Sequence, residues 1–238
     1  MFTHKPSTPI SSRVTVCLFA CVMLAVAGCG GSSKHGATSS HTRAGATSAA
    51  AQKPTGSPPA ALAGVRGRVL RAGEMKGFSP QGRRLLGINP QSWVAEAVGA
   101  SLSDAQQAAE IALLQREGFV AAVSENLSAT LSAGGGDVPG LSIVEQFRSP
   151  GGARAELSAN IRQDKAGPSP GARFEPFPVS RIPAARGFGY SGTSAANVAF
   201  TKGSYYYLVG AGGSPSGSGS ARALVIAAAR HLYHRVAQ

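Results

Sequence analysis

Two glutamates in the sequence could form an acid/base pair. Glu125 lies in residues 119–131 and Glu145 in residues 141–148, and alternating apolar side chains predict that both segments are strands of one β-hairpin. If the hairpin is symmetric about Gly135, the two carboxylates face each other on the core side of the strands. Each would then raise the pKa of the other, which is how paired carboxyl groups divide acid and base roles.

Another pairing of the strands would separate the two glutamates. The loop between the segments is long enough to leave the register open, so a bulge or a shift could expose one carboxylate. Arg116 or Arg148 could also pair with either of them. The pair therefore supports a hydrolase-type enzyme as one hypothesis, and a purely structural role for both residues is the competing interpretation.

Three consecutive tyrosines could form part of a binding surface. In a strand, Tyr205 and Tyr207 point to one face and Tyr206 to the other. Tyrosine offers a large contact area with a polar tip, which suits recognition of a ligand or a partner. Three further aromatic residues could line the same groove between sheet and helix, namely Trp93, Phe188 and Tyr190. Packing in the core is the alternative, because aromatic residues are also ordinary strand formers.

Other motifs known to support chemistry lack their required context here. Residues 187–192 match the glycine pattern of dinucleotide-binding loops, but a strand is expected after them where the mechanism needs a helix N-terminus. Residues 167–171 match a nucleophile elbow, yet Pro170 has no N–H for an oxyanion. His231 and His234 share a helix face, but the folded part offers no third histidine. We therefore expect no metal, no cofactor and no catalytic residue of these kinds.

The N-terminal residues have the layout of an export signal. Lys5 and Arg13 precede an almost wholly apolar run, residues 14–27, which is too short for a membrane span of about 20 residues. The run ends in Val26-Ala27-Gly28-Cys29, which resembles the lipobox of bacterial lipoproteins. The resemblance implies a signal peptide over residues 1–28 and a diacylglyceryl group on Cys29. Such a lipid would anchor the protein at the extracytoplasmic face of the cell membrane.

Cleavage without lipidation is the alternative. Residues 25–27, Ala-Val-Ala, also fit a signal peptidase site that would release a secreted protein. Cys17 and Cys21 leave with the signal in either case, so Cys29 is the one thiol of the mature chain. No intramolecular disulfide can form, and the folded part must rely on its core.

A segment without acidic residues follows the cysteine. Residues 29–64 consist mainly of Gly, Ser, Thr, Ala and Pro, and we expect them to form a disordered tether. The formal charge of the chain is +12, and every Asp and Glu lies between Glu74 and Glu175. The cations of the tether favour anionic lipid headgroups. Because no Lys/Arg cluster is interleaved with aromatic residues, nucleic acid is not an expected partner.

The remaining residues, 65–238, suffice for a single domain. Four helices are predicted, at residues 90–98, 103–117, 149 to at least 161, and 220–236. Strands are predicted at residues 67–71, 119–131, 141–148, 173–179, 187–190, 197–202 and 205–210. Ser103 and Gln106 form a capping box, and Gly118 follows the same helix where a C′ glycine belongs. This order indicates an α+β fold, an antiparallel sheet with helices packed on it.

Three segments show a family resemblance: GLSIVEQFRSPGGARAEL from Gly140, FPVSRIPAARGFGY from Phe177, and NVAFTKGSYYYLVGAG from Asn197. They resemble uncharacterised lipoproteins of high-GC Gram-positive bacteria, and the order of elements over residues 65–238 is similar to that of PsbP-like α/β sandwiches. That fold occurs in photosystem extrinsic proteins, envelope lipoproteins and the extracytoplasmic sensor domains of some kinases. The resemblance implies a PsbP-like sandwich and assigns no functional residue.

A lipid-anchored, non-enzymatic binding or sensor module of the cell envelope is the leading functional hypothesis. Besides the membrane, its partner would be an envelope protein or a small apolar ligand. The alternatives are an envelope enzyme that uses Glu125 and Glu145, and a purely structural lipoprotein. A deep groove near the aromatic residues would favour ligand binding. A flat, filled sandwich would favour protein contacts or a structural role, and a polar cleft that holds both glutamates would favour an enzyme.

The lipobox resemblance predicts that Cys29→Ala abolishes lipidation. Without the thiol no thioether can form, so the chain should incorporate no tagged fatty acid and should leave the membrane fraction. Metabolic labelling followed by fractionation measures both effects. Cys21→Ala changes only the expected signal peptide, so this control should keep the label. Unchanged processing and membrane retention of Cys29→Ala would contradict the anchor.

Overall fold

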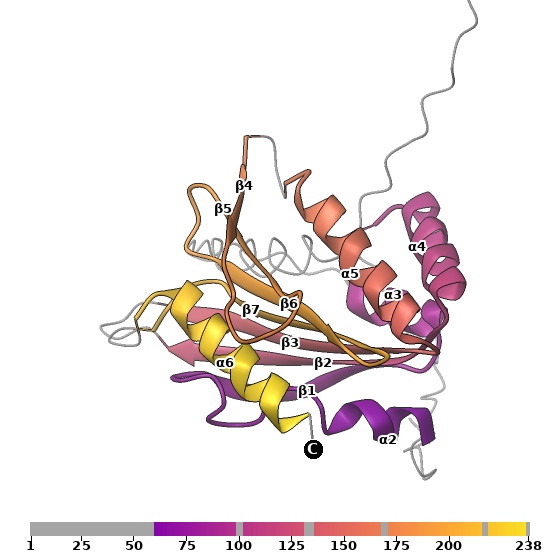
Figure 1. The fold of residues 1–238 in the computed structure, drawn as a ribbon, viewed down its shortest axis with the longest axis horizontal. Coiled ribbons are helices and arrows are strands. Elements are labelled where there is room, and N and C mark those ends of the chain that lie inside the picture. Colours follow the sequence, from indigo (N-terminus) through magenta and orange to yellow (C-terminus); the bar gives the residue numbers. More distant parts are fainter. Residues whose placement is uncertain (1–59, 99–101, 131–135, 168–170, 216–218, 237–238) are drawn as a thin grey trace, which may run out of the picture.

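An antiparallel sheet of seven strands forms the middle of the described structure (Figure 1). The computed structural model describes residues 60–98, 102–130, 136–167, 171–215 and 219–236. The strands lie in the spatial order β1-β2-β3-β7-β6-β5-β4. Their bounds are Ser79–Gly87 for β1, Phe119–Thr130 for β2, Asp137–Phe147 for β3, Phe174–Phe177 for β4, Arg186–Tyr190 for β5, Ala196–Lys202 for β6 and Tyr205–Ala211 for β7.

Helices cover both faces of this sheet. In the described ranges they are α2 Ala60–Arg66, α3 Pro90–Val98, α4 Asp104–Glu117, α5 Pro150–Asp164 and α6 Ala221–Arg235. Helices α2 and α6 pack on one face, and α3, α4 and α5 pack on the other (Figure 1). The predicted α+β class, with helices on an antiparallel sheet, is therefore confirmed. Among the helices of the described ranges, none has the length and apolar character that a membrane span requires.

Capping residues mark the helix starts that the sequence predicted. The Ser103 hydroxyl accepts a hydrogen bond from the backbone N–H of Gln106, and the Gln106 side chain accepts one from the backbone N–H of Ser103. Gly118 ends α4 with φ 79°, a left-handed conformation that glycine adopts without a steric cost. Ser149 and Ser220 cap α5 and α6 in the same way, each accepting from a backbone N–H three residues on.

Residues of the central strands alternate between the two helix layers. In β2, Ala121 and Val123 pack with α2 and α6, whereas Ala122 packs with α3 and α4. In β7, Tyr207 belongs to the first layer and Tyr206 to the second. Because both faces are covered, the central strands are buried almost continuously rather than at every second residue.

The helical part of the domain begins earlier than the composition indicated. Helix α2 begins at Ala60, so residues 60–64 of the expected tether are helical, and the predicted boundary at residue 65 is wrong. Leu62 in this segment is buried against the sheet, and that contact stabilises a helix too short to form alone.

The first strand also lies elsewhere than predicted. Residues 67–71 form a turn after α2 rather than a strand, and the first strand is β1. Its sequence, SPQGRRLLG, contains a proline, a glycine and two arginines, which are untypical of a strand. Gly82 has φ 78° within an irregular part of the β1–β2 pairing, and this irregularity hides the alternation from a periodic search.

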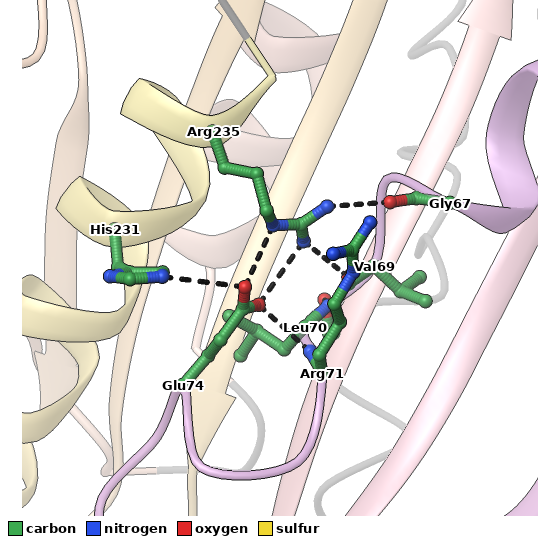
Figure 2. Close-up of polar contacts among 8 residues, drawn as sticks. Gly67, Val69, Leu70, Arg71, Glu74, His231 and Arg235 are labelled. Carbon is green, nitrogen blue, oxygen red and sulfur yellow. Dashed lines mark hydrogen bonds and ion pairs between the residues drawn. The ribbon is translucent and has the colours of Figure 1, made fainter. Parts of the chain in front are cut away.

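One carboxylate holds the loop between α2 and β1 against α6 (Figure 2). Glu74 Oε1 lies 2.7 Å from Nε of Arg235 and 3.4 Å from Nε2 of His231. The same guanidinium donates to the carbonyl oxygens of Gly67 and Val69, at 2.6 and 2.7 Å. These contacts join the N-terminal loop of the domain to its C-terminal helix.

Helix α5 approaches its neighbours very closely at Gly152. A Cβ atom at this position would lie 2.1 Å from the carbonyl oxygen of Glu117 and 3.1 Å from Cβ of Phe147. At Gly151 a Cβ atom would meet only the hydroxyl of Ser149, at 3.4 Å. A clash with backbone cannot be relieved by rotating a side chain, so the position of α5 requires glycine at residue 152.

This contact predicts that Gly152→Ala destabilises the domain. Overpacking of this kind costs about 1–3 kcal/mol, and the backbone oxygen of Glu117 leaves little room for relaxation. Gly151→Ala is the matched control and should keep or raise stability, because alanine favours helix. Urea denaturation of the full chain measures both variants. Equal free energies of unfolding would show that α5 is not held by this contact.

Candidate functional site

The pairing of β2 with β3 separates Glu125 from Glu145. Glu125 lies opposite Ser142, and Glu145 lies opposite Ala122. A hairpin symmetric about Gly135 would have placed the two glutamates opposite each other, so the predicted facing pair is wrong. The observed pairs, such as Thr130 with Asp137, are not symmetric about that position, because the burial of side chains on two faces sets the register.

The two glutamates lie on opposite faces of the sheet and have different partners. Glu125 is in step with Val123 on the α2/α6 face, where Arg84 Nε donates to Glu125 Oε2. Glu145 is in step with Ile143 on the other face, where its Oε1 accepts a hydrogen bond of 2.8 Å from Trp93 Nε1. Because an acid/base pair needs both carboxyl groups in one site, the enzyme hypothesis based on this pair is wrong.

A layer of buried carboxyl groups lies between α5 and the sheet. Glu156, Asn160 and Asp164 recur every four residues along α5, and each is at most 5% exposed. Asn160 Nδ2 donates to Glu156 Oε1 at 2.8 Å. Burial raises the pKa of Glu145 well above its usual value, and repulsion by Glu156 raises it further, while the hydrogen bond from Trp93 opposes both.

Asp164 belongs to the same layer. The Tyr190 hydroxyl donates to Asp164 Oδ1 at 3.0 Å. Burial raises the pKa of Asp164 to about 7, although the hydrogen bond from Tyr190 acts in the opposite direction. Burial also raises the pKa of the neighbouring Tyr206 hydroxyl, and the charge of Glu145 adds to that effect. At a pH between their ordinary and raised pKa values, Glu145 and Asp164 therefore retain protons that exposed carboxyl groups would have lost.

The aromatic residues expected to line one groove belong to two separate layers. On the α3/α4/α5 face lie Trp93, Phe188, Tyr190 and Tyr206, and on the α2/α6 face lie Tyr205 and Tyr207. The predicted division of the three tyrosines between the faces is confirmed. All of these rings except Tyr205 are at most 8% exposed, so they pack in the core. The prediction that they form a shared binding surface is therefore wrong.

The remaining motifs lie in β5, in α6 or outside the described residues. Strand β5 contains the first glycines of residues 187–192 and leads into β6, so the strand expected after this motif is confirmed. Pro170 and Cys29 lie outside the described residues. His231 lies beside Glu74, as shown above (Figure 2). In the part of the chain that the structure describes, no three His, Cys, Asp or Glu residues are placed to hold a metal ion.

An open groove of about 820 Å³ lies between α5 and the β4–β5 end of the sheet. We call it the α5 groove. One wall consists of side chains of α5 and its C-cap, and the other of Phe174, residues 176–179 and residues 184–187. Its volume lies within the range of about 300–1,000 Å³ that is usual for small-molecule sites.

The floor of the α5 groove is apolar. Leu157 and Phe177 are buried in it, and Ile161 and Phe174 are half-buried. The ring of Phe174 stacks on Phe188, with 5.4 Å between ring centroids and an interplanar angle of 20°. One of the predicted site residues, Phe188, thus supports the groove from behind without lining it.

The rim of the α5 groove is cationic. Arg154 and Arg162 of α5, Lys165 at its C-cap and Arg186 at the start of β5 all line it, and all four are exposed. Within the described ranges, none of these side chains forms an ion pair or a hydrogen bond. None of the described residues that line the groove is acidic. The rim can therefore attract an anion without meeting a competing carboxylate.

Sequence reasoning missed this rim, although the spacing of its α5 residues can be recognised in the sequence. Arg154, Ser158 and Arg162 are four residues apart, which places them on one side of a helix, and Lys165 follows at the next turn. The cation of the other wall could not be recognised in this way, because Arg186 lies far along the chain and is placed at the groove by the pairing of β5 in the sheet.

The fold and the groove define an α+β domain with an antiparallel sheet, helices on both faces and a basic groove open to solvent. No family model matches the chain, and no curated protein matches its sequence. Among solved structures, the extracellular domain of PknH from Mycobacterium tuberculosis is similar, with a TM-score of 0.44 and 14% identity. The match covers 75% of this chain and 100% of that one. The resemblance to PsbP-like sandwiches stays a prediction from the sequence.

The buried layer predicts that Asp164→Asn stabilises the protein at alkaline pH. The pKa of Asp164 is about 7 in the folded state, and that of an unfolded aspartate is about 3.9, so the folded state binds more protons between these values. Stability therefore falls as the pH rises from about 4 to about 7. Asparagine cannot ionise, and its carbonyl oxygen still accepts from Tyr190.

Thermal unfolding at about pH 4.5 and about pH 8 measures this effect. The variant should gain stability relative to the natural chain at the higher pH and little at the lower one. Glu175→Gln, at an exposed position of β4, controls for the loss of a negative charge. An Asp164→Asn chain that loses as much stability as the natural chain between the two pH values would contradict the buried protonated carboxyl.

Proposed function

We propose that this chain is a non-enzymatic binding module of the cell envelope, held at the extracytoplasmic face of the membrane by a lipid on Cys29. The observation that supports binding is the α5 groove, an open concave site with an apolar floor and cations on both walls. The anchor rests on the sequence alone, because Cys29 lies outside the described residues.

Two rim cations lack an ion-pair partner among the described residues, and this favours a ligand-binding role over a purely structural one. A cation that serves the fold has its partners within the fold, as Arg235 has in Glu74 and two carbonyl oxygens. Arg162 and Arg186 line the groove from opposite walls and have no such partner among the described residues. An anionic ligand that contacted both would gain charge-assisted hydrogen bonds from the two walls.

Native mass spectrometry of the full chain, recovered from its own membrane, tests the proposal. We expect a non-covalent ligand in addition to the acyl chains of the anchor. Arg162→Gln combined with Arg186→Gln removes one cation from each wall and should strongly reduce the retained ligand, because two of the four rim cations are lost.

Arg71→Gln combined with Lys76→Gln is the matched control. These two exposed cations lie in the loop between α2 and β1, next to the sheet edge opposite β4, and their loss changes the net charge equally. This variant should keep the ligand. If the natural chain retained nothing, or if the groove variant retained as much as the control, the binding module would be rejected in favour of a structural lipoprotein.

A further inference from the structure

We infer that the occupant of the α5 groove is a single anionic phospholipid, with its phosphate between the two cationic walls and an acyl chain on the apolar floor. The inference rests on the proposed function and names the chemistry of its ligand. Four observations support it: the two-sided rim, the apolar floor, its preformed shape, and the poor edge that the groove offers to a peptide strand.

The rim suits a phosphate. Arg162 of α5 and Arg186 of β5 approach from opposite walls, with Arg154 and Lys165 farther along the same groove. A phosphate oxygen pair matches the planar fork of arginine, and several oxygens allow arginines from both walls to bind at once. The Ser158 hydroxyl, which lines the same wall, already donates to the carbonyl oxygen of Arg154 at 2.8 Å and can still accept.

The apolar floor favours a ligand with a hydrocarbon part over a free inorganic anion. Ile161 and Phe174 are half-buried and present apolar surface to the groove, beside the buried Leu157 and Phe177. A bare phosphate would leave this surface in water. A ligand with a hydrocarbon chain covers it and gains the hydrophobic contribution that the phosphate alone lacks.

The floor is also preformed. Gly187 lets the Phe177 ring lie against β5, since a Cβ atom there would be 2.3 Å from the ring. On the far side, the guanidinium of Arg222 lies 4.7 Å from the centroid of the same ring. Phe177 is therefore held between β5 and α6, and a ligand pays little ordering entropy when it contacts the ring.

An extended peptide fits this place poorly. Strand β4 is the edge strand of the sheet and has only four residues. One of them, Pro176, has no N–H to offer, and peptides that add a strand to a sheet edge depend on backbone hydrogen bonds. The groove thus favours a ligand that binds through charge and apolar contact over one that binds through its backbone.

The expected anchor would supply the ligand. If residues 29–59 form the expected tether, its root-mean-square span of roughly 30 Å would keep the start of α2 near the membrane surface. The anionic lipids of that leaflet are then the nearest molecules that combine a phosphate with an acyl chain.

Native mass spectrometry of the full chain in a non-ionic detergent, titrated with defined lipids, tests the inference. The probes are lysophosphatidylglycerol, lysophosphatidylcholine with the same acyl chain, and glycerol 3-phosphate. We expect the anionic lysolipid to bind about tenfold more tightly than the zwitterionic one, because its charge is not compensated. Glycerol 3-phosphate should bind more weakly than either, because it leaves the floor uncovered.

Two variants assign this binding to the groove. Arg162→Gln with Arg186→Gln should weaken both lysolipids, because both contain the phosphate, and should weaken the anionic one more, so that the preference for it falls. Ile161→Ser should weaken both lysolipids and leave glycerol 3-phosphate unaffected. The rim positions are exposed, so the rim variant keeps the fold and tests the inference even if Ile161→Ser proves unstable. Arg71→Gln with Lys76→Gln should bind like the natural chain.

The outcomes separate this inference from the proposed function. Equal affinity for both lysolipids, or tight binding of glycerol 3-phosphate, would overturn the assignment of an anionic phospholipid to the groove. An acidic peptide or a non-lipid compound retained by the natural chain and lost from the rim variant would also overturn it, while the binding module would stand. A chain that binds no probe and retains no ligand from its own membrane would overturn both.

Discussion

The pairing of β2 with β3 is the constraint on which the rest of the structure depends, because both strands are buried on both faces. A step of one residue would exchange the side chains of the two helix layers. If β3 took this step, Glu145 would lose Trp93, whereas Glu125 would keep Arg84, because that contact joins β2 to β1. A buried polar group without its partner costs about 1–3 kcal/mol, so the contact of Glu145 with Trp93 favours this register along with the apolar residues around it.

Helix α5 connects the buried sheet with the candidate site. Its inner side places Glu156, Asn160 and Asp164 against the sheet face that contains Glu145, and its outer side provides the cationic wall of the groove. The helix can lie so close because residue 152 is glycine. The two sides of α5 are therefore parts of one arrangement, in which the buried side raises the pKa of Asp164 to about 7 and the exposed side lines the groove.

Features that depend on neighbouring residues were predictable from the sequence, whereas features that depend on residues far apart in the chain were not. The capping box of Ser103 and Gln106 needs only neighbouring residues, and it was predictable for that reason. Strand β1 was not predictable, because its irregular pairing around Gly82 interrupts the alternation. The tyrosines of β7 were placed on the correct faces, yet their burial depends on helices that other segments supply. The groove was missed because its two walls come from separate parts of the chain.

The sequence by itself determined the class of the fold, four of the five helices in the described ranges, most strands, and the expectation that Cys29 is lipidated. These features follow from periodicity, caps and short motifs, all of which act over a few residues. Only the tertiary structure decided that Glu125 and Glu145 lie on opposite faces, that most of the aromatic rings are core, and that Arg162 and Arg186 line one groove with an apolar floor. The physical reason is that register, burial and the approach of two walls arise from contacts between residues far apart in the chain, and no local pattern encodes them.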